Sequence, residues 1–365
     1  MKKLIVAAVA AAVVAPVSVM ASAPVLYGKL QMSVNLLDNN ASAGPDYSET
    51  SLNSNHSLMG FKGSEDLGNG MKIGYLIEWS LDMDGDNSTS GAGDLNERNR
   101  AVTLSGEWGT ILVGKWDTPL KTVGRKVELF AERLGDQRNM NSGVALDARA
   151  DNVIAYVTPN MNGLSATVAY VTDASDVVET GLFTSTAGTD GADNSDNSAI
   201  SANVIYNNGP ILVAAAYEQF SDGNFLTAAN TTPEDQTTWR LAGSYSFGDF
   251  KVLGTYTDIS DGAGIVDNDF DIWTIGGSYA MGNNTIKVQY GTRDRSDVYV
   301  DTGADQWAIG LDHTMSNRTT VYVEYATLDN EGLSSSRSWA TMGNNALGDA
   351  GEDTDGFGVG IIHKF

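Results

Sequence analysis

The chain has 365 residues, and its 22 Lys and Arg against 46 Asp and Glu give a formal net charge of −24 at pH 7. This acidic balance argues against a nucleic-acid partner, which requires a basic surface. The absence of cysteine excludes a disulfide scaffold and cysteine-based metal or redox chemistry, and a hydrophobic content of 42% excludes bulk disorder.

The first segment has the order of a secretory signal. A basic start, Met1–Lys3, precedes an uninterrupted apolar run at 4–14 and then Pro16 and small residues. The run is shorter than the roughly 20 residues that a membrane-spanning helix needs. We predict a signal peptide at 1–21, with Ala23 as the alternative cleavage position, followed by a single domain over 22–365.

From Val25 onward, short segments alternate between apolar and polar residues. In 71–81, for example, Ile73, Tyr75 and Ile77 share one face, while Lys72 and Glu78 share the other. Strict alternation predicts a strand with one apolar and one polar face. The same pattern recurs at 285–293, 306–313 and 318–327.

The connections between these segments alternate in length. Short turns rich in Gly and Asn are expected at 67–70, 108–109, 160–163, 207–210, 248–249, 282–284 and 316–317. Long polar stretches lie at 39–56, 83–98, 119–148, 173–197, 220–237, 258–269, 294–304 and 328–354. These fifteen connections join sixteen strands, with both chain ends on the side of the short turns.

Sixteen alternating strands with short turns on one side and long loops on the other predict an antiparallel transmembrane β-barrel. A closed barrel leaves no unpaired backbone groups in lipid. A soluble β-sandwich would also alternate, but it explains the aromatic residues at strand ends less well. Those residues, which we interpret as two interfacial girdles, are Trp79, Trp116, Tyr170, Tyr217, Trp239, Tyr256, Trp273 and Tyr279.

The negative charge is concentrated in the predicted long loops. The segments 82–97, 173–196, 258–271 and 329–355 together hold 22 acidic residues and one basic residue, Arg337. They therefore carry −21 of the net −24. Solvated loops explain this acidity, and divalent cations bridging the carboxylates to anionic surface lipid are the alternative. The segment 82–88 resembles a calcium loop but lacks the Gly and Glu positions of an EF-hand.

Several segments in order resemble the sixteen-stranded, trimeric general-diffusion porins of Gram-negative outer membranes. They are 26–30, 60–70, 109–115, 151–156 and the alternating C-terminal strand that ends on Phe365. The resemblance implies an outer-membrane location and a homotrimer. It also implies contacts with outer-membrane lipid and lipopolysaccharide, and recognition of Phe365 by the barrel-assembly machinery.

In this family the third long loop folds into the barrel and narrows it. Here that loop is expected at about 118–148, and it is more apolar than the other loops. The resemblance implies that loop carboxylates face a ladder of basic residues on the barrel wall. The acidic candidates are Glu128, Glu132 and Asp136, and the basic candidates are Lys29, Lys62, Lys115 and Arg149.

One position departs from the family pattern. Leu58 stands where a basic wall residue is common, so two alternatives are open: the basic ladder is thinner here, or Arg98 and Arg100 substitute for the missing residue. The alternation with Val102 and Leu104 argues against a lumen-facing position for both arginines. Other lumen-lining candidates oppose the apolar faces of their strands: Lys251, Arg240, Lys287, Arg293 and Glu324.

Catalysis has little support in the sequence. The three histidines are His56 in the first predicted loop, His313 beside Asp312, and His363 on the final strand, and no hydrolase, zinc-protease or phosphate-loop motif occurs. We therefore expect no enzyme and no cofactor.

A water-filled channel for passive diffusion of ions and small hydrophilic solutes is the expected function. The acidic outer mouth predicts mild cation selectivity, although the basic ladder opposes it. A substrate-specific channel of the same fold and a non-conducting surface or adhesive barrel are the alternatives.

Overall fold

The computed structural model describes residues 24–40, 47–85, 95–141, 143–174, 197–225, 232–299, 301–332, 334 and 351–365. The predicted signal peptide, 1–21, lies outside the described residues, as do most of the acidic segments 82–97, 173–196 and 329–355 and part of 82–88. Within the described part, no helix is both long and apolar enough to cross a bilayer.

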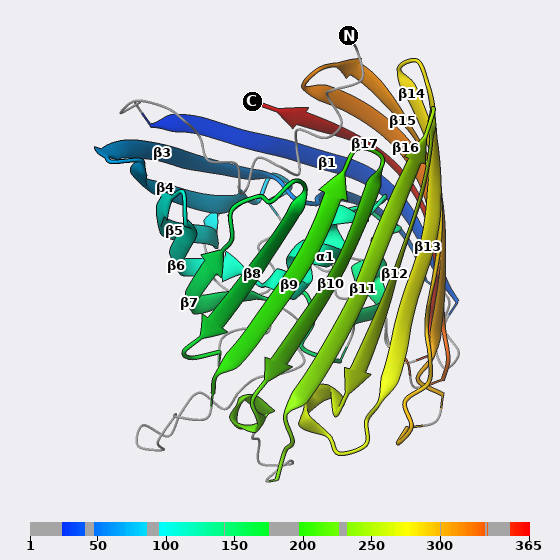
Figure 1. Cartoon of the computed structure of the whole chain (residues 1–365). Coiled ribbons are helices and arrows are strands. Elements are labelled where there is room, and N and C mark those ends of the chain that lie inside the picture. The colour runs from blue at the N-terminus through cyan, green and yellow to red at the C-terminus, as the bar shows by residue number, and fades with distance from the viewer. Residues whose placement is uncertain are drawn as a thin grey trace.

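The described chain is almost entirely antiparallel sheet (Figure 1). The strands are β1 (Val25–Asn40), β2 (Tyr47–Ser54), β3 (Leu58–Gly68), β4 (Met71–Leu81), β5 (Leu95–Gly106), β6 (Gly109–Asp117), β7 (Arg149–Val157), β8 (Leu164–Val171), β9 (Ala199–Asn208), β10 (Ile211–Phe220), β11 (Gln236–Phe247), β12 (Phe250–Ser260), β13 (Phe270–Met281), β14 (Asn284–Arg293), β15 (Ala304–Ser316), β16 (Thr319–Asn330) and β17 (Asp353–Lys364). The helices are α1 (Pro119–Lys126) and the short 3-10 segments η3 (Gln137–Asn141), η5 (Asp222–Phe225) and η6 (Gly262–Gly264).

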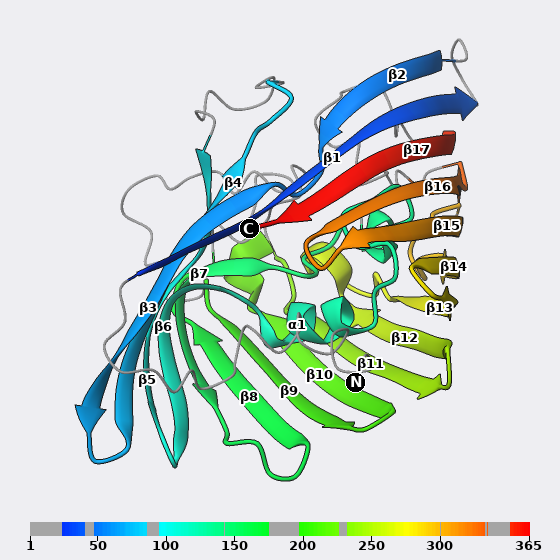
Figure 2. The ribbon, with the colours of Figure 1, turned by 90° about the horizontal axis from the view of Figure 1, so that it is seen from above.

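The sheet closes on itself. Apart from β2, which pairs with β1 and not with β3, each strand pairs with the next along the chain, and β17 pairs with β1 over twelve positions, from Lys29↔Lys364 to Asn40↔Asp353. Viewed from above, the strands form a ring around the interior (Figure 2). The pairing of β17 with β1 closes the ring, as a barrel in lipid requires.

The second strand of the barrel wall is divided into two shorter strands, β2 and β3. Both β2 and β3 pair with β1, at Met32↔Ser54 and Lys29↔Leu58 respectively, and residues 55–57 interrupt them. Counting β2 and β3 as one wall strand gives the sixteen predicted strands. The strands reach further into the predicted loop at 39–56 than expected, because Asn39 and residues 47–54 belong to the β1–β2 ladder.

The alternation predicted from the sequence is confirmed by the side-chain positions. Ile73, Tyr75 and Ile77 of β4 are exposed on the outer surface. Near the long-loop ends, outer aromatic rings pack in pairs, such as Tyr217–Trp239 at 4.6 Å and Tyr290–Trp307 at 4.4 Å between centroids. Near the short turns, Phe250 stacks on Tyr279 at 4.3 Å. Trp116 differs from the expected girdle, because it packs against an interior apolar cluster.

The seven predicted short turns all lie between consecutive strands. Gly209 and Gly248 occupy two of them with φ of 59° and 62°, a left-handed conformation that glycine adopts without steric cost. The ladder between β1 and β17 reaches Phe365, whose N–H donates to Gly28 O at 3.1 Å. The C-terminus therefore lies at the end of the barrel that carries the short turns (Figure 1).

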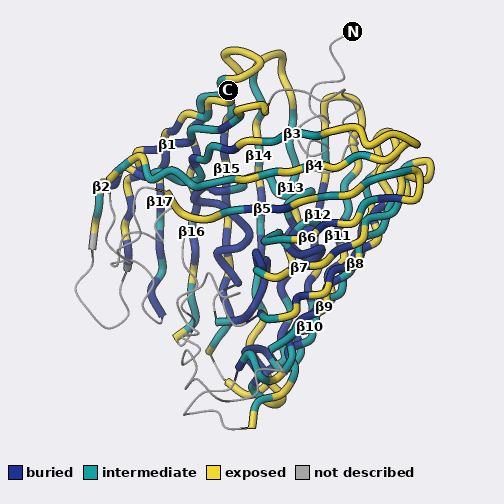
Figure 3. Tube along the Cα trace, turned by 90° about the vertical axis from the view of Figure 1, so that its left-hand side faces the viewer, coloured by how far each residue is buried: buried dark blue, intermediate teal, exposed yellow. Residues whose placement is uncertain are grey.

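The connection between β6 and β7, residues 118–148, folds into the barrel, and we call it the inner loop. It contains α1 and η3, and Leu120, Val123, Val127 and Phe130 within it are completely buried. Buried stretches of the chain gather inside the wall in Figure 3. The apolar core of this barrel is therefore the contact between the inner loop and the inner face of the sheet.

Candidate functional site

Wall glycines leave room for the apolar side chains of the inner loop. A Cβ atom added to Gly310 would lie 2.8 Å from the Phe130 ring, and one added to Gly291 would lie 2.4 Å from Met140 Cε. Gly276, Gly356 and Gly358 face Leu129 and Leu134 at 2.8–3.1 Å in the same way. These glycines form a footprint on β13, β14, β15 and β17 that fixes where the loop lies.

Three buried wall glutamines hold the tip of the inner loop through its backbone. The side-chain amides of Gln31 and Gln289 donate to the carbonyls of Glu132 and Gly135, each at 2.9 Å. Gln306 donates to the Leu134 carbonyl at 3.2 Å. A buried carbonyl without a partner is costly, so these amides both satisfy and position the tip.

Ion pairs tie the same loop to the wall. Asp147 pairs with Arg240 of β11, and Arg133 binds both carboxylate oxygens of Asp312, at 2.7 and 3.2 Å. Lys287 also reaches Asp312, at 2.6 Å. Asp312 therefore lies between two cations.

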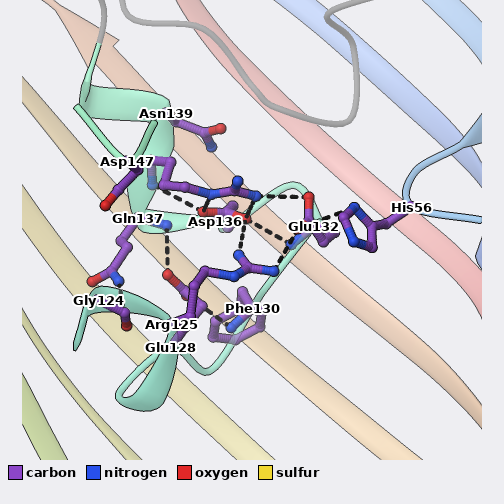
Figure 4. Close-up of polar contacts among 12 residues, drawn as sticks. His56, Gly124, Arg125, Glu128, Phe130, Glu132, Asp136, Gln137, Asn139 and Asp147 are labelled. Carbon is purple, nitrogen blue, oxygen red and sulfur yellow. Dashed lines mark hydrogen bonds and ion pairs between the residues drawn. The ribbon is translucent and has the colours of Figure 1, made fainter. Parts of the chain in front are cut away.

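The predicted loop carboxylates face arginines of their own loop. Arg138 binds Glu132 at 2.6 Å and Asp136 at 2.7 Å, and Arg125 also contacts both carboxylates (Figure 4). We call these four side chains the charge cage. Burial opposes ionisation of Glu132, but the two guanidiniums outweigh it and hold its pKa well below the usual range. The resemblance implied that these carboxylates would face the wall, and the cage differs from that arrangement.

Glu128 lies outside the charge cage and behaves differently. Its oxygens accept the N–H groups of Phe130 at 3.1 Å and Gln137 at 3.3 Å. Burial and the neighbouring Asp136 carboxylate raise the pKa of Glu128 to about 8. At neutral pH this side chain is therefore mostly protonated and adds little negative charge to the interior.

The four basic candidates are not all brought to the inner loop. Lys29 donates to Gln31 at 2.9 Å, next to the loop tip, and Lys62 lies 4.7 Å from the centre of the Tyr27 ring. Arg149 is buried, 3.0 Å from Asp117 at the base of the loop. The Lys115 side chain instead lies on the outer face of β6, as those of Ile111 and Val113 do, and pairs with Asp151 at 3.1 Å. A bulge between β6 and β7 at this point explains the local change of partners.

A second bulge corrects the expectation for Arg98. The register between β4 and β5 shifts between Ile77 and Trp79, which turns Arg98 into the lumen. There Arg98 lies 3.9 Å from Glu78 and 2.9 Å from His56. Arg100 remains outside, with its guanidinium over the Trp79 ring. Alternation alone could not reveal this shift.

Four of the five other lumen candidates contact the inner loop directly. Lys287, Arg240 and Arg293 donate to loop carbonyls at 3.0–3.4 Å, and Glu324 accepts the Leu134 N–H at 3.1 Å. The fifth, Lys251, lies on β12 near a short turn and is partly buried. Sequence reasoning missed His56, which it placed in an outer loop. The structure places it 3.2 Å from Glu132 of the loop tip.

A closed antiparallel barrel with an apolar outer surface and a charged, loop-narrowed interior defines the class of transmembrane β-barrel proteins. The family model for Gram-negative porins matches residues 7–333. The chain belongs to the Gram-negative porin family and is therefore a protein of the outer membrane.

Individual relatives show the same similarity. Outer membrane porin protein 32 of Delftia acidovorans is 29% identical over 240 residues, which cover 64% of this chain and 63% of that protein. Major outer membrane protein P.IB of Neisseria meningitidis serogroup B is 32% identical over 174 residues, covering 47% and 49%. The matched segments thus span half to just under two thirds of these relatives.

Solved structures match over nearly the whole chain. The anion-selective porin from Comamonas acidovorans is 27% identical, with a TM-score of 0.74 and coverage of 94% of this chain and 99% of that one. A Salmonella typhi OmpF structure, at 15% identity and a TM-score of 0.67, shows the shared fold alone.

Proposed function

We propose that the barrel forms a water-filled channel through which ions and small hydrophilic solutes diffuse passively across the outer membrane. The observation that carries the proposal is the charged interior, parts of which are accessible to solvent. The Arg125 side chain, on the inner loop, remains 27% exposed although the barrel wall surrounds it. Lys29, Lys62 and Lys126 are also partly exposed. In this proposal Lys29, Lys62, Arg98 and Arg149 form the wall side of the constriction, and Arg125 and Lys126 form the loop side.

We infer that this constriction prefers anions, which is opposite to the mild cation selectivity expected from the outer loops. Asp312 is shared by Arg133 and Lys287, and Asp117 is shared by Lys121 and Arg149. The charge cage is balanced, with two acids and two bases, and Glu128 is mostly neutral. The resulting positive excess favours anions in a narrow opening. The similarity to an anion-selective porin supports the same sign.

We also propose that the chain assembles as a homotrimer, since the structurally similar OmpT of Vibrio cholerae has been solved in a trimer form. Contacts with lipopolysaccharide and with the barrel-assembly machinery through Phe365 remain part of this proposal. Phe365 is 41% exposed beside the start of β1, where a partner could reach it.

Planar-bilayer recording of the refolded protein tests the channel and its selectivity. Ohmic openings in groups of three would support a trimeric diffusion channel. The reversal potential in a potassium chloride gradient would then give the preferred ion. An absence of conductance from a correctly folded barrel would overturn the proposed channel, and a reversal potential toward the potassium equilibrium would overturn the anion preference.

A further inference from the structure

The interruption between β2 and β3, at residues 55–57, places one side chain of the wall next to the inner loop. Relative to β1, the segment 55–57 contains one extra residue, as in a β-bulge. Ser57 Oγ accepts the Gln31 N–H at 3.0 Å, and the Asn55 N–H donates to Gln31 O at 3.1 Å. The bulge keeps the backbone bonded while it releases His56 from the regular alternation of the strand.

His56 connects two charged groups from different parts of the molecule. Its Nε2 lies 2.9 Å from Arg98 Nη2 of β5, and its Nδ1 lies 3.2 Å from Glu132 Oε1 of the loop tip. Figure 4 shows the imidazole turned toward Glu132. A guanidinium can only donate, so Nε2 must be the acceptor. The proton of the neutral ring therefore sits on Nδ1 and is donated to Glu132.

Glu132 is a sensitive point of the inner loop. Its φ of 59° lies in the left-handed region, which non-glycine residues adopt only when surrounding contacts hold them. Its carbonyl accepts from Gln31 at 2.9 Å, and its N–H donates to Asp136 at 2.6 Å. A change in the partner of the Glu132 carboxylate would therefore alter the position of the whole loop tip.

We propose that His56 is a positioning residue that links Arg98 of the wall to the tip of the inner loop, and that protonation breaks this link. A proton taken up from lumen water by Nε2 removes the acceptor of Arg98 and places two cations in contact. Arg98 then turns toward Glu78, 3.9 Å away, and the tip loses this tether to β5. This inference rests on the proposed channel, because its consequence is a change in the constriction.

The charged groups that act on His56 come from three elements. Burial of the ring lowers the pKa of His56 well below its usual value, Glu132 of the inner loop opposes this effect, and Arg98 of β5 and Lys29 of β1 add to it. The link is therefore intact near neutral pH and is broken in acid. The added positive charge should also strengthen the anion preference in acid.

The tautomer of His56 provides a test that does not depend on conduction. His313 and His363 are exposed near the short turns, where they contact Asn284 and Thr319. Replacing both by glutamine leaves His56 as the one histidine of the original three. Nuclear magnetic resonance of this variant with labelled histidine should show the Nδ1–H tautomer at neutral pH. A dominant Nε2–H tautomer would overturn the proposal.

Channel recordings in the same background test the positioning role. His56→Gln can still accept from Arg98 and donate to Glu132, but it cannot take up a proton. We expect the background variant to gain open-channel noise and anion preference in acid, and His56→Gln to lose this acid step completely. His56→Phe, which makes neither hydrogen bond, should be noisy already at neutral pH. An unchanged acid step in His56→Gln would overturn the link. If no variant conducts, the proposed channel fails, and the tautomer still decides the geometry of His56.

Discussion

Two acidic regions of this molecule behave in opposite ways. In the charge cage of the inner loop, Glu132 and Asp136 are buried, and each contacts Arg125 and Arg138. At the outer rim, carboxylates on the outward face stand beside one another. In the ladders, Asp258 is opposite Asp271, and Asp305 is opposite Asp329. We call these four residues, together with Asp294 and Asp355, the outer collar.

The outer collar lies directly above the aromatic girdle of the long-loop side. Tyrosine hydroxyls of the girdle donate to it, from Tyr290 to Asp305 at 2.5 Å and from Tyr325 to Asp355 at 3.0 Å. Burial and the nearby Asp271 and Asp305 raise the pKa of Asp294, as like charges do. Acidic residues thus hold the structure together where arginines enclose them, and repel one another at the rim. The net charge of the whole chain therefore does not indicate the charge inside the barrel.

The largest effect is expected from opening the charge cage. Arg138→Met should leave two buried carboxylates with one guanidinium fewer, at a cost of about 3–5 kcal/mol. The loop tip should then detach from the wall. The barrel should unfold at a lower temperature, which can be measured as the temperature at which heating changes its electrophoretic mobility. Channel recordings should show larger and noisier openings.

An exposed ion pair provides the matched control for the cage. Arg295 binds both oxygens of Glu331 at 2.6 Å but lies at the surface. Arg295→Met should change neither the unfolding temperature nor the conductance measurably, because water and salt screen exposed pairs. Equal losses in the two variants would contradict the special role of the buried cage.

The glycine footprint should give the next largest effect. In Gly310→Val, the new side chain would push against Phe130 and should cost about 1–3 kcal/mol through overpacking. Gly243 of β11 is the control, because its added Cβ would meet nothing closer than 3.5 Å. Gly243→Ala should therefore be nearly neutral in thermal unfolding. If both variants unfold like the original protein, the footprint does not hold the loop.

A smaller, pH-dependent effect is expected from Glu128. Its pKa of about 8 means that the folded protein keeps a proton that the unfolded chain releases near the usual glutamate value. The free energy of unfolding should therefore fall as the pH rises between these two values and then level off. Over the same upper range the anion preference should weaken, because Glu128 becomes negative. Glu128→Gln should abolish both trends in pH-dependent unfolding and reversal-potential measurements.

Alternation and turn residues were sufficient to predict the barrel wall. The outward set of Ile73, Tyr75 and Ile77 follows from a period of two, and the turn at Gly248 follows from its residue type. Both signals depend only on residues that are neighbours in the chain, so they can be recognised in a single sequence. The inner loop was anticipated from its apolar composition together with the family resemblance.

The details of the candidate site depend on contacts that the local sequence does not contain. A bulge of one residue inverts the facing of Arg98 relative to Arg100, and no nearby Gly or Pro marks it. The pairing of Arg138 with Glu132 follows from the fold of the loop rather than from a strand or helix period. His56 looked like a loop residue because polar residues surround it, yet it lies between Ser54 and Leu58, which both pair with β1. Such positions require the tertiary structure.

The smallest effect is expected from the outer collar. At low salt its carboxylates should attract cations to the channel mouth and oppose the anion preference of the constriction. Raising the ionic strength from 0.1 to 1 M shortens the screening length from about 10 to about 3 Å, which removes the influence of the exposed collar before that of the buried constriction. The anion preference should therefore increase with salt in the original protein. In the double variant Asp305→Asn and Asp329→Asn, reversal potentials should depend less on salt and approach the original values at 1 M. A preference that shifts toward cations at high salt would mean that the collar and the constriction have been assigned the wrong signs.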